Sequence, residues 1–186
     1  IASCLVGSEM CIRDREDTVN EGGNKVITFA GSDPEGSSLD FVVLTNPEFG
    51  SISTVDGVTT YTHNGSETTA DTFTYASYDG TAQSAAATVS LTITPVNSPP
   101  VVTAVAFTIN EADASTFNLA TTSTEPEGQS MTYAYTSPTN GSITSFNAAT
   151  GEITYTHDGS ETTSDTFTYT AIDADALSSA SGTVTV

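Results

Sequence analysis

The sequence predicts an all-β protein made of two β-sandwich modules in tandem. Three observations support this: a long internal repeat, apolar residues that alternate with polar ones, and turn-forming residues between the alternating runs. The repeat is clearest in YTHNGSETTADTFTY (61–75) and YTHDGSETTSDTFTY (155–169), which differ only at Asn64/Asp158 and Ala70/Ser164. A catalytic signature is needed once per active site, so a copied stretch indicates a building unit.

The repeat extends well beyond these two stretches. VNEGGNKVITFAGSDPEGSSLDF (19–41) aligns with INEADASTFNLATTSTEPEGQSMTY (109–133), and FGSISTVDGVTTYTH (49–63) aligns with NGSITSFNAATGEITYTH (140–157). Val19 corresponds to Ile109 and Tyr61 to Tyr155, so the offset grows from 90 to 94 residues. A period of about ninety residues fits one small sandwich per repeat.

Within each repeat the apolar residues recur at every second position, as a half-buried strand requires. Phe73 and Tyr75 share one face of DTFTYASYD, and ATVSLTI (87–93) alternates in the same way. DPEG, VDG, HNG and YDG mark turns, and helix should be nearly absent. The residues expected in the core are Ile27, Phe29, Leu39, Ile52, Tyr61, Phe73, Tyr75, Val89 and Leu91, with Phe117, Leu119, Met131, Ile143, Tyr155, Phe167, Tyr169 and Val184 in the second module.

The charge balance excludes several classes of partner. The 186 residues carry 23 acidic and three basic side chains, a formal net charge of −20. Nucleic acids and anionic membrane surfaces would be repelled. The chain also lacks the run of about 18 apolar residues that a spanning helix needs, so no membrane insertion is expected. The acids either keep an exposed protein soluble or, at a few positions, coordinate Ca²⁺.

The beginning of the chain differs from the rest. CLVGSEMCIRDR resembles a translated sequencing-adapter read-through, which predicts that residues 1–15 are non-native and make few contacts, with no bridge between Cys4 and Cys11. A rival interpretation takes IASC as a lipoprotein cleavage box. The predicted modules are then 16–97 and 98–186, joined end to end through the Pro99–Pro100 linker, and the second is expected to be truncated in its last strand as part of a longer array.

The order of motifs carries a family likeness. NE, then DPEG or EPEG, then G-x-I, YTHxGSE, DTFTYxxxD and VNSPP resemble the cadherin-like tandem repeats, an Ig-like β-sandwich module, of large bacterial surface and secreted proteins. The resemblance covers residues 16–186. It implies Greek-key sandwiches, an extracellular location at the cell surface or in secreted form, and a role as structural or adhesive spacer, with neighbouring repeats of the same chain as partners.

The resemblance also implies Ca²⁺ at the junction between modules. Carried over position by position, the ligands are Glu21, Glu67, Asn97, Glu125, Glu127 and Asp173. Ser98 and Pro95 stand where the family usually has acidic residues.

No catalytic constellation is visible in the sequence. His63 and His157 are the two histidines, and they occupy equivalent repeat positions without a second ligand or nucleophile nearby in the sequence. We therefore expect each to bond a nearby loop. The chain contains no G-x-S-x-G, H-E-x-x-H or P-loop motif, which argues against an enzyme. Two alternatives to a spacer are a module that binds a carbohydrate or a cell-surface protein, and an accessory domain of a secreted enzyme.

Overall fold

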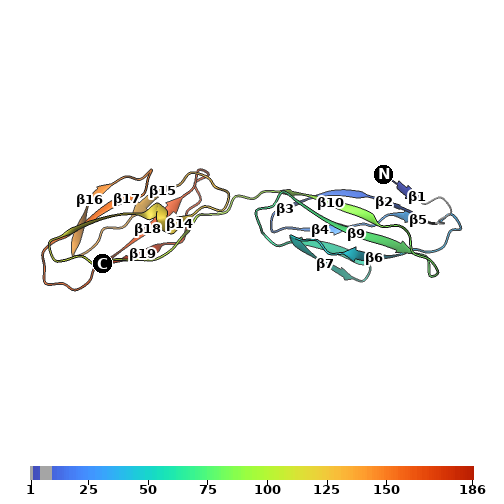
Figure 1. Ribbon diagram of the computed structural model, residues 1–186, viewed down its shortest axis with the longest axis horizontal. Helices are drawn as coiled ribbons and strands as arrows, with labels where there is room; N and C mark the ends of the chain where they lie inside the picture. The colour runs from blue at the N-terminus through green and yellow to red at the C-terminus, as the bar shows by residue number, and fades with distance from the viewer. Residues whose placement is uncertain (1, 5–9) are drawn as a thin grey trace. The chain divides into compact units, whose positions relative to one another are not determined.

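The protein consists of two compact all-β units. The computed structural model describes residues 2–4 and 10–186, and the chain divides between Val96 and Asn97 (Figure 1). We call these parts the first unit and the second unit. Among the described residues the one helical element is a single 3₁₀ turn, η1 (Leu119–Thr122). None of the described residues form a helix with the length and hydropathy needed to cross a bilayer.

The first unit is a sandwich of two main sheets with a small third sheet at one edge. In spatial order, one main sheet contains β3 (Arg15–Asn20), β10 (Ala87–Thr94), β9 (Ala70–Tyr78) and β6 (Asp40–Thr45). The facing sheet contains β4 (Asn24–Ile27), β8 (Val58–His63) and β7 (Gly50–Val55). The small sheet contains β1 (Ala2–Cys4), β2 (Cys11–Arg13) and β5 (Gly31–Ser32).

The second unit repeats this arrangement. One sheet contains β12 (Val105–Ala106), β19 (Gly182–Thr185), β18 (Thr166–Ile172) and β15 (Thr132–Tyr135). The facing sheet contains β13 (Ala114–Asn118), β17 (Glu152–His157) and β16 (Gly141–Phe146). A short pair is formed by β11 (Val101–Val102) and β14 (Ser123–Thr124).

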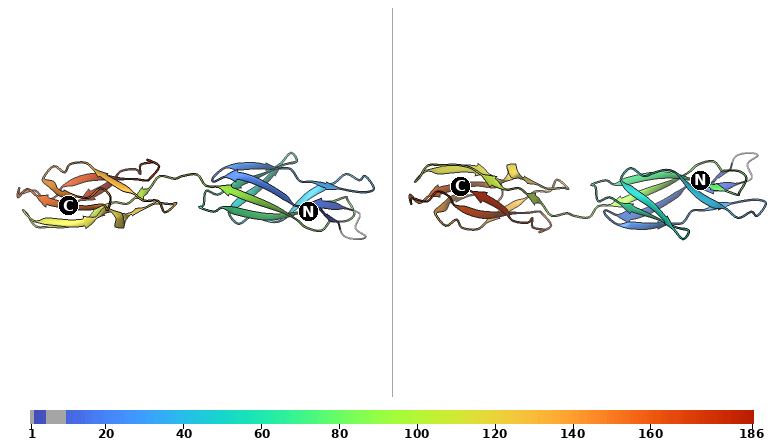
Figure 2. Two further views of the ribbon diagram at one scale, coloured as in Figure 1. Left: turned by 90° about the horizontal axis from the view of Figure 1, so that it is seen from above. Right: turned by 90° about the horizontal axis from the view of Figure 1, so that it is seen from below.

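Both units have the same strand order and the same strand directions. In each unit one early strand runs parallel to the last strand, β3 beside β10 and β12 beside β19, and the other pairs of this sheet are antiparallel. In each unit the chain crosses repeatedly between the two facing sheets, which is a Greek-key connection (Figure 2). The predicted fold class, tandem Greek-key sandwiches with almost no helix, is confirmed.

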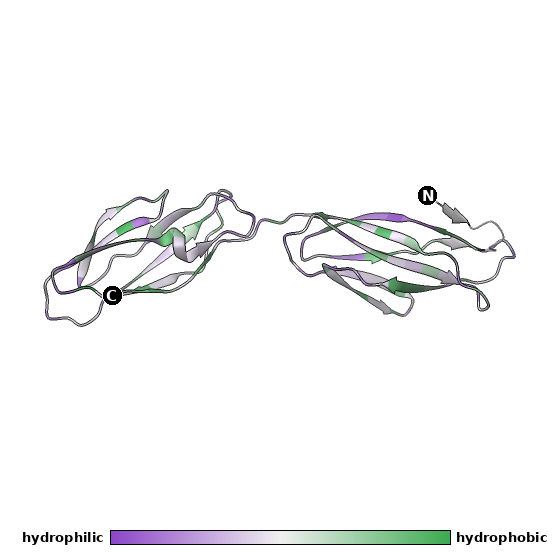
Figure 3. Ribbon diagram, in the orientation of Figure 1, coloured by the Kyte–Doolittle hydropathy of each residue, from purple (hydrophilic) through white to green (hydrophobic). Residues whose placement is uncertain are grey.

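The core of each unit lies between its sheets and follows the alternation of the sequence (Figure 3). Most predicted core residues are buried or pack against the core, and Tyr61, Tyr75, Tyr155 and Tyr169 are its largest buried side chains. Each such aromatic side chain contributes about 1.5–3 kcal/mol through burial. The prediction for Leu39 is wrong: it lies in the turn-rich segment before β6, is half-buried beside Gly31, and stays outside the core cluster.

The expectation that residues 1–15 make few contacts is wrong for the part that the structure describes; residues 1 and 5–9 lie outside it. Met10 and Ile12 are buried, and β2 pairs with β5 as β11 pairs with β14 in the second unit. The Tyr75 hydroxyl donates to the Arg13 carbonyl at 2.6 Å. Cys11 is disulfide-bonded, which contradicts the expected absence of a bridge, and β1 places Cys4 opposite Cys11 in the strand register. The described part of this segment thus supplies β2, the middle strand of the small sheet, and two buried side chains to the first unit.

The copied stretch supplies one buried aspartate to each unit. Asp71 and Asp165 each accept three backbone N–H groups and one tyrosine hydroxyl: Glu48, Phe49, Thr72 and Tyr61 for Asp71, and Thr139, Asn140, Thr166 and Tyr155 for Asp165. A Cβ at Gly50 or Gly141 would lie 2.4–2.6 Å from the ring or hydroxyl of that tyrosine, so the G-x-I glycine cannot be replaced. The repeated residues therefore build the same buried arrangement of aspartate, tyrosine and glycine in each sandwich, which we call the pin.

Candidate cation-binding loops

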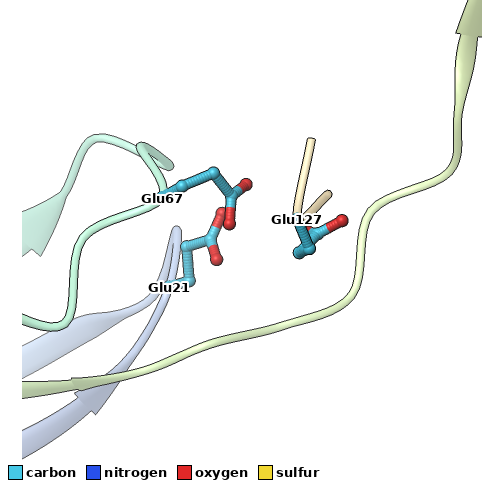
Figure 4. A group of neighbouring side chains, drawn as sticks. All are labelled: Glu21, Glu67 and Glu127. Atoms are coloured by element: carbon cyan, nitrogen blue, oxygen red, sulfur yellow. The ribbon is translucent and has the colours of Figure 1, made fainter. Parts of the chain in front are cut away.

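The first unit brings two of the predicted metal ligands together. Glu21 lies in the turn after β3, and Glu67 lies in the loop after β8. Their carboxylate oxygens lie within 4.8 Å of each other (Figure 4). Glu127, also drawn there, belongs to the second unit and is described with it. Two carboxylates at this spacing repel each other and favour a cation.

Glu21 also holds the chain where it leaves the first unit. Its backbone N–H donates to Thr94 O at 2.9 Å, at the end of β10. Its carboxylate accepts the N–H of Val96 at 3.3 Å. The side chain therefore contacts the last residue before the second unit begins.

In the second unit the turn Glu125–Gly128 presents two more carboxylates. Gly128 N donates to Glu125 O at 3.2 Å, which closes the turn, and Gln129 N donates to Glu125 Oε2 at 2.6 Å. Glu127 Oε1 accepts the N–H of Ser98 at 2.9 Å. Ser98 thus joins the cluster through its backbone N–H.

Asp173 is the fixed point of a second loop in this unit. It accepts the backbone N–H groups of Asp175 and Leu177 at 2.9 and 2.8 Å, and Asn97 Nδ2 at 2.8 Å. Desolvation would raise the pKa of Asp173, but the hydrogen bonds from Asn97 and the loop amides lower it below its ordinary value. The carboxylate is therefore held in its charged form.

Gln129 connects the two loops of the second unit. Its side-chain amide donates to Asn97 Oδ1 at 2.7 Å and to Asp175 Oδ2 at 2.9 Å. Among the described residues, three oxygens of this cluster are buried without a hydrogen-bond partner: Glu125 Oε1, Glu127 Oε2 and Gln129 Oε1. A buried unpaired carboxylate oxygen is costly, and hard oxygen donors of this kind suit Ca²⁺, so the residues fit that ion.

The six predicted ligands thus fall into two groups. Glu21 and Glu67 lie together in the first unit, and Asn97, Glu125, Glu127 and Asp173 lie together in the second. The sequence prediction missed Gln129 and Asp175. The sequence contains a signal for each, because Gln129 directly follows the EPEG turn and Asp175 is the second acid of DAD.

The two histidines bond nearby loops, as predicted. His63 Nδ1 accepts the N–H of Gly22 and Gly65 at 3.1 and 3.2 Å, and its Nε2 contacts Thr68 Oγ1 at 3.0 Å. His157 makes the corresponding contacts in the second unit.

Known families account for nearly the whole chain. Residues 97–186 match the bacterial cadherin-like domain, and residues 11–92 match the bacterial Ig domain. The first unit therefore contains a bacterial Ig domain, and the second unit is a bacterial cadherin-like domain. The predicted cadherin-like resemblance is confirmed. The match to the Ig domain begins at residue 11 and so includes part of the segment 1–15 that we expected to be non-native. No curated protein matches the chain.

Solved cadherin structures share the fold. The human desmocollin-1 ectodomain is similar with a TM-score of 0.60 and 13% identity, over 92% of this chain and 39% of that one. Mouse cadherin-23 EC22–24 has a TM-score of 0.53 and 19% identity, over 92% and 62%. Human mucin-like protocadherin EC1–2 has a TM-score of 0.52 and 12% identity, over 95% and 96%. The chain spans about two fifths of the desmocollin ectodomain, and at these identities the likeness shows the fold alone.

Proposed function

We propose that the chain is a spacer of a bacterial extracellular protein, whose joint between modules is stiffened by Ca²⁺. The observation that carries the proposal is the set of three buried, unpartnered oxygens on Glu125, Glu127 and Gln129. An apolar core would not contain them, and a cation would satisfy all three. The family match supports a module that extends or presents other domains.

Covalent continuity supports a site at the linker. Glu21 holds the N–H of Val96, and Asp173 holds the side chain of Asn97. These are consecutive residues, whose Cα atoms are about 3.8 Å apart. The carboxylates of each unit are thus anchored next to the same peptide bond, whatever the orientation of the units.

The chain's own residues would do three things. Hydrogen bonds to Asp173 and Glu125 preorganise the two loops. The linker backbone is held from both sides, and Glu125 and Glu127 each present one unpartnered oxygen. When bound, Ca²⁺ would supply the positive charge that a chain of net charge −20 lacks. Glu21, Glu67, Asn97, Glu125, Glu127 and Asp173 supply enough oxygen for the roughly six to eight ligands that Ca²⁺ takes.

Thermal unfolding in a Ca²⁺ titration tests this function. Extracellular modules bind Ca²⁺ with a Kd of about 0.1–1 mM. At 100 times the Kd the ion adds about 2.7 kcal/mol to the unfolding free energy of the unit that holds it. The effect should exceed that of Mg²⁺ at equal ionic strength and disappear in Glu67→Gln/Asp173→Asn. The proposal would be contradicted if Mg²⁺ stabilised the protein against thermal unfolding as much as Ca²⁺ does, or if the double variant kept the full stabilisation by Ca²⁺.

A second function, a peptide-binding module, is favoured by one apolar groove. The groove has a volume of about 240 Å³ and lies in the first unit beside Val26, Phe29, Phe41 and Val58. Phe41 is 36% exposed, whereas Tyr133, its counterpart in the strand register of the second unit, is 5% exposed. In the second unit the turn at 147–151 lies against Tyr133: Tyr133 N donates to Ala148 O at 2.9 Å, and a Cβ at Gly151 would lie 3.0 Å from the Tyr133 ring.

We propose a short polypeptide segment with an apolar anchor as the ligand of the open groove. Selection from a library of displayed random peptides on the first unit, with the second unit as control, tests this. Selected peptides should carry an aliphatic or aromatic anchor and lose binding to Phe41→Ser. Peptides that bind both units alike, or bind Phe41→Ser unchanged, would exclude the groove.

A further inference from the structure

We propose that His63 is the positioning residue that fixes the turn carrying Glu21 against the loop carrying Glu67. Its effect on metal affinity rests on the proposed calcium function, whereas its effect on the two loops does not. The imidazole joins two segments that are more than forty residues apart in the sequence.

The ring lies at the end of β8 and is 3% exposed. Backbone N–H groups can only donate, so Nδ1 is the acceptor for both Gly22 and Gly65. The proton of the neutral ring is then on Nε2, which donates to Thr68 Oγ1 at 3.0 Å. All the hydrogen-bonding capacity of the imidazole is used to connect the two segments.

The bonded residues are next to the glutamates. Gly22 directly follows Glu21, and Thr68 directly follows Glu67. A shift at either contact therefore moves a carboxylate. Gly22 has φ of +62°, a backbone conformation that residues other than glycine rarely adopt. This conformation belongs to the turn whose Gly22 N–H donates to the His63 ring.

The loop also holds its own shape locally. Ser66 N donates to Asn64 Oδ1 at 3.0 Å, and Thr68 N donates to Ser66 O at 2.7 Å. These bonds stay within the loop and do not reach the Glu21 turn. The imidazole links the turn to the loop against the mutual repulsion of two carboxylates whose oxygens lie within 4.8 Å.

The second unit contains the same histidine arrangement, but the hydrogen bond from the turn to the ring is longer. His157 Nδ1 accepts from Gly159 at 3.1 Å but from Ala112 at 3.5 Å, and its Nε2 contacts Thr162 at 3.0 Å. Ala112 stands where the first unit has Gly22 and keeps φ of +60°. Asp165 and Asp173 flank opposite ends of β18, and His157 lies near the Asp165 end. His157 is therefore far from the candidate ligand Asp173 and serves as a matched control.

The experiment compares His63→Phe, His63→Asn and the control His157→Phe in the full chain. Phe keeps the ring volume and removes both hydrogen-bonding atoms, and Asn keeps an acceptor near the Nδ1 position. In metal-free protein, amide hydrogen exchange at Gly22 and Gly65 should rise at least about tenfold in His63→Phe. His63→Asn should restore most of the protection, and His157→Phe should leave both amides unchanged.

Calcium affinity is the second readout. Loss of a residue that orients metal ligands typically lowers affinity about 10–100-fold. We expect a loss of about tenfold in His63→Phe and no change in His157→Phe. Thr68→Val, which removes one contact and keeps the shape, should lower the affinity by a smaller factor and serves if His63→Phe fails to fold.

Unchanged exchange at Gly22 and Gly65 in metal-free His63→Phe, or in metal-free Thr68→Val if His63→Phe fails to fold, would overturn the positioning role. A wild-type chain that binds no Ca²⁺ would overturn the proposed function, and the exchange data would then decide the role of His63 alone. Equal calcium affinity in His63→Phe and wild type, with exchange raised, would overturn the link between the ring and the metal.

Discussion

The two units share a repeated sequence and one strand order, yet they close their sandwiches differently. In the second unit, η1 and the turn at 147–151 meet, and Leu119 N donates to Gly151 O at 2.9 Å. In the first unit the corresponding turn is the short Asp56–Gly57, and Phe41 remains exposed. The pin made by aspartate, tyrosine and glycine is the same in both. The comparison shows that the duplicated residues hold the buried framework, while insertions changed one edge.

The largest effect should come from breaking the pin, and it should be equal in the two units. Asp165→Ala leaves the N–H groups of Thr139, Asn140 and Thr166 without their acceptor, and it leaves the Tyr155 hydroxyl only its 3.2 Å contact with Asn140 O. We expect a loss of about 3–5 kcal/mol of unfolding free energy in the second unit, and the same for Asp71→Ala in the first. Denaturant unfolding of the separate units, monitored by tyrosine fluorescence, measures both losses. A difference of more than about 2 kcal/mol between the variants would show that the pins are not equivalent.

The next effect should distinguish the units. Ile12 in β2 pairs with β5, and Val102 in β11 occupies the corresponding position opposite β14. Ile12 is fully buried, whereas Val102 is partly exposed. Ile12→Ala should cost about 2–4 kcal/mol, and Val102→Ala should cost less. Urea midpoints at a constant m value give the two numbers. A neutral Ile12→Ala would mean that β2 contributes little to the packing of the first unit.

The smallest effect concerns alkaline pH. Desolvation, followed by the hydrogen bond to Asp165, raises the pKa of Tyr155 to about 12, and the same causes raise the pKa of Tyr61 further. Their stabilising contribution is complete below the unfolded pKa of about 10 and is lost as pH rises through the folded value. Stability of both units should therefore fall from about pH 10 upward, with Tyr61 titrating last. Absorbance titration of phenolate formation in Tyr155→Phe and Tyr61→Phe assigns the two steps. Titration of either tyrosine near pH 10 would contradict its burial.

The sequence predicted the sandwiches well because burial and alternation are local properties. The six candidate ligands came from the family pattern as one set, and their binding of Ca²⁺ stays a prediction. It failed at residues 10–15, since the pairing of β2 with β5 and the contact from Tyr75 to Arg13 join distant segments. Gln129 was missed for a similar reason: its role depends on Asn97 and Asp175, which the fold brings to it. Composition cannot show such contacts.

We propose that Ca²⁺ stiffens the joint between the units, and backbone relaxation tests this proposal most directly. Amide ¹⁵N relaxation of the wild-type chain, with and without Ca²⁺, measures the rotational correlation time of each unit. We predict two short times in metal-free protein and one longer shared time at saturating Ca²⁺, with no such change in Glu127→Gln/Asp173→Asn. Correlation times that stay the same on adding Ca²⁺, or that lengthen equally in the double variant, would contradict the claim.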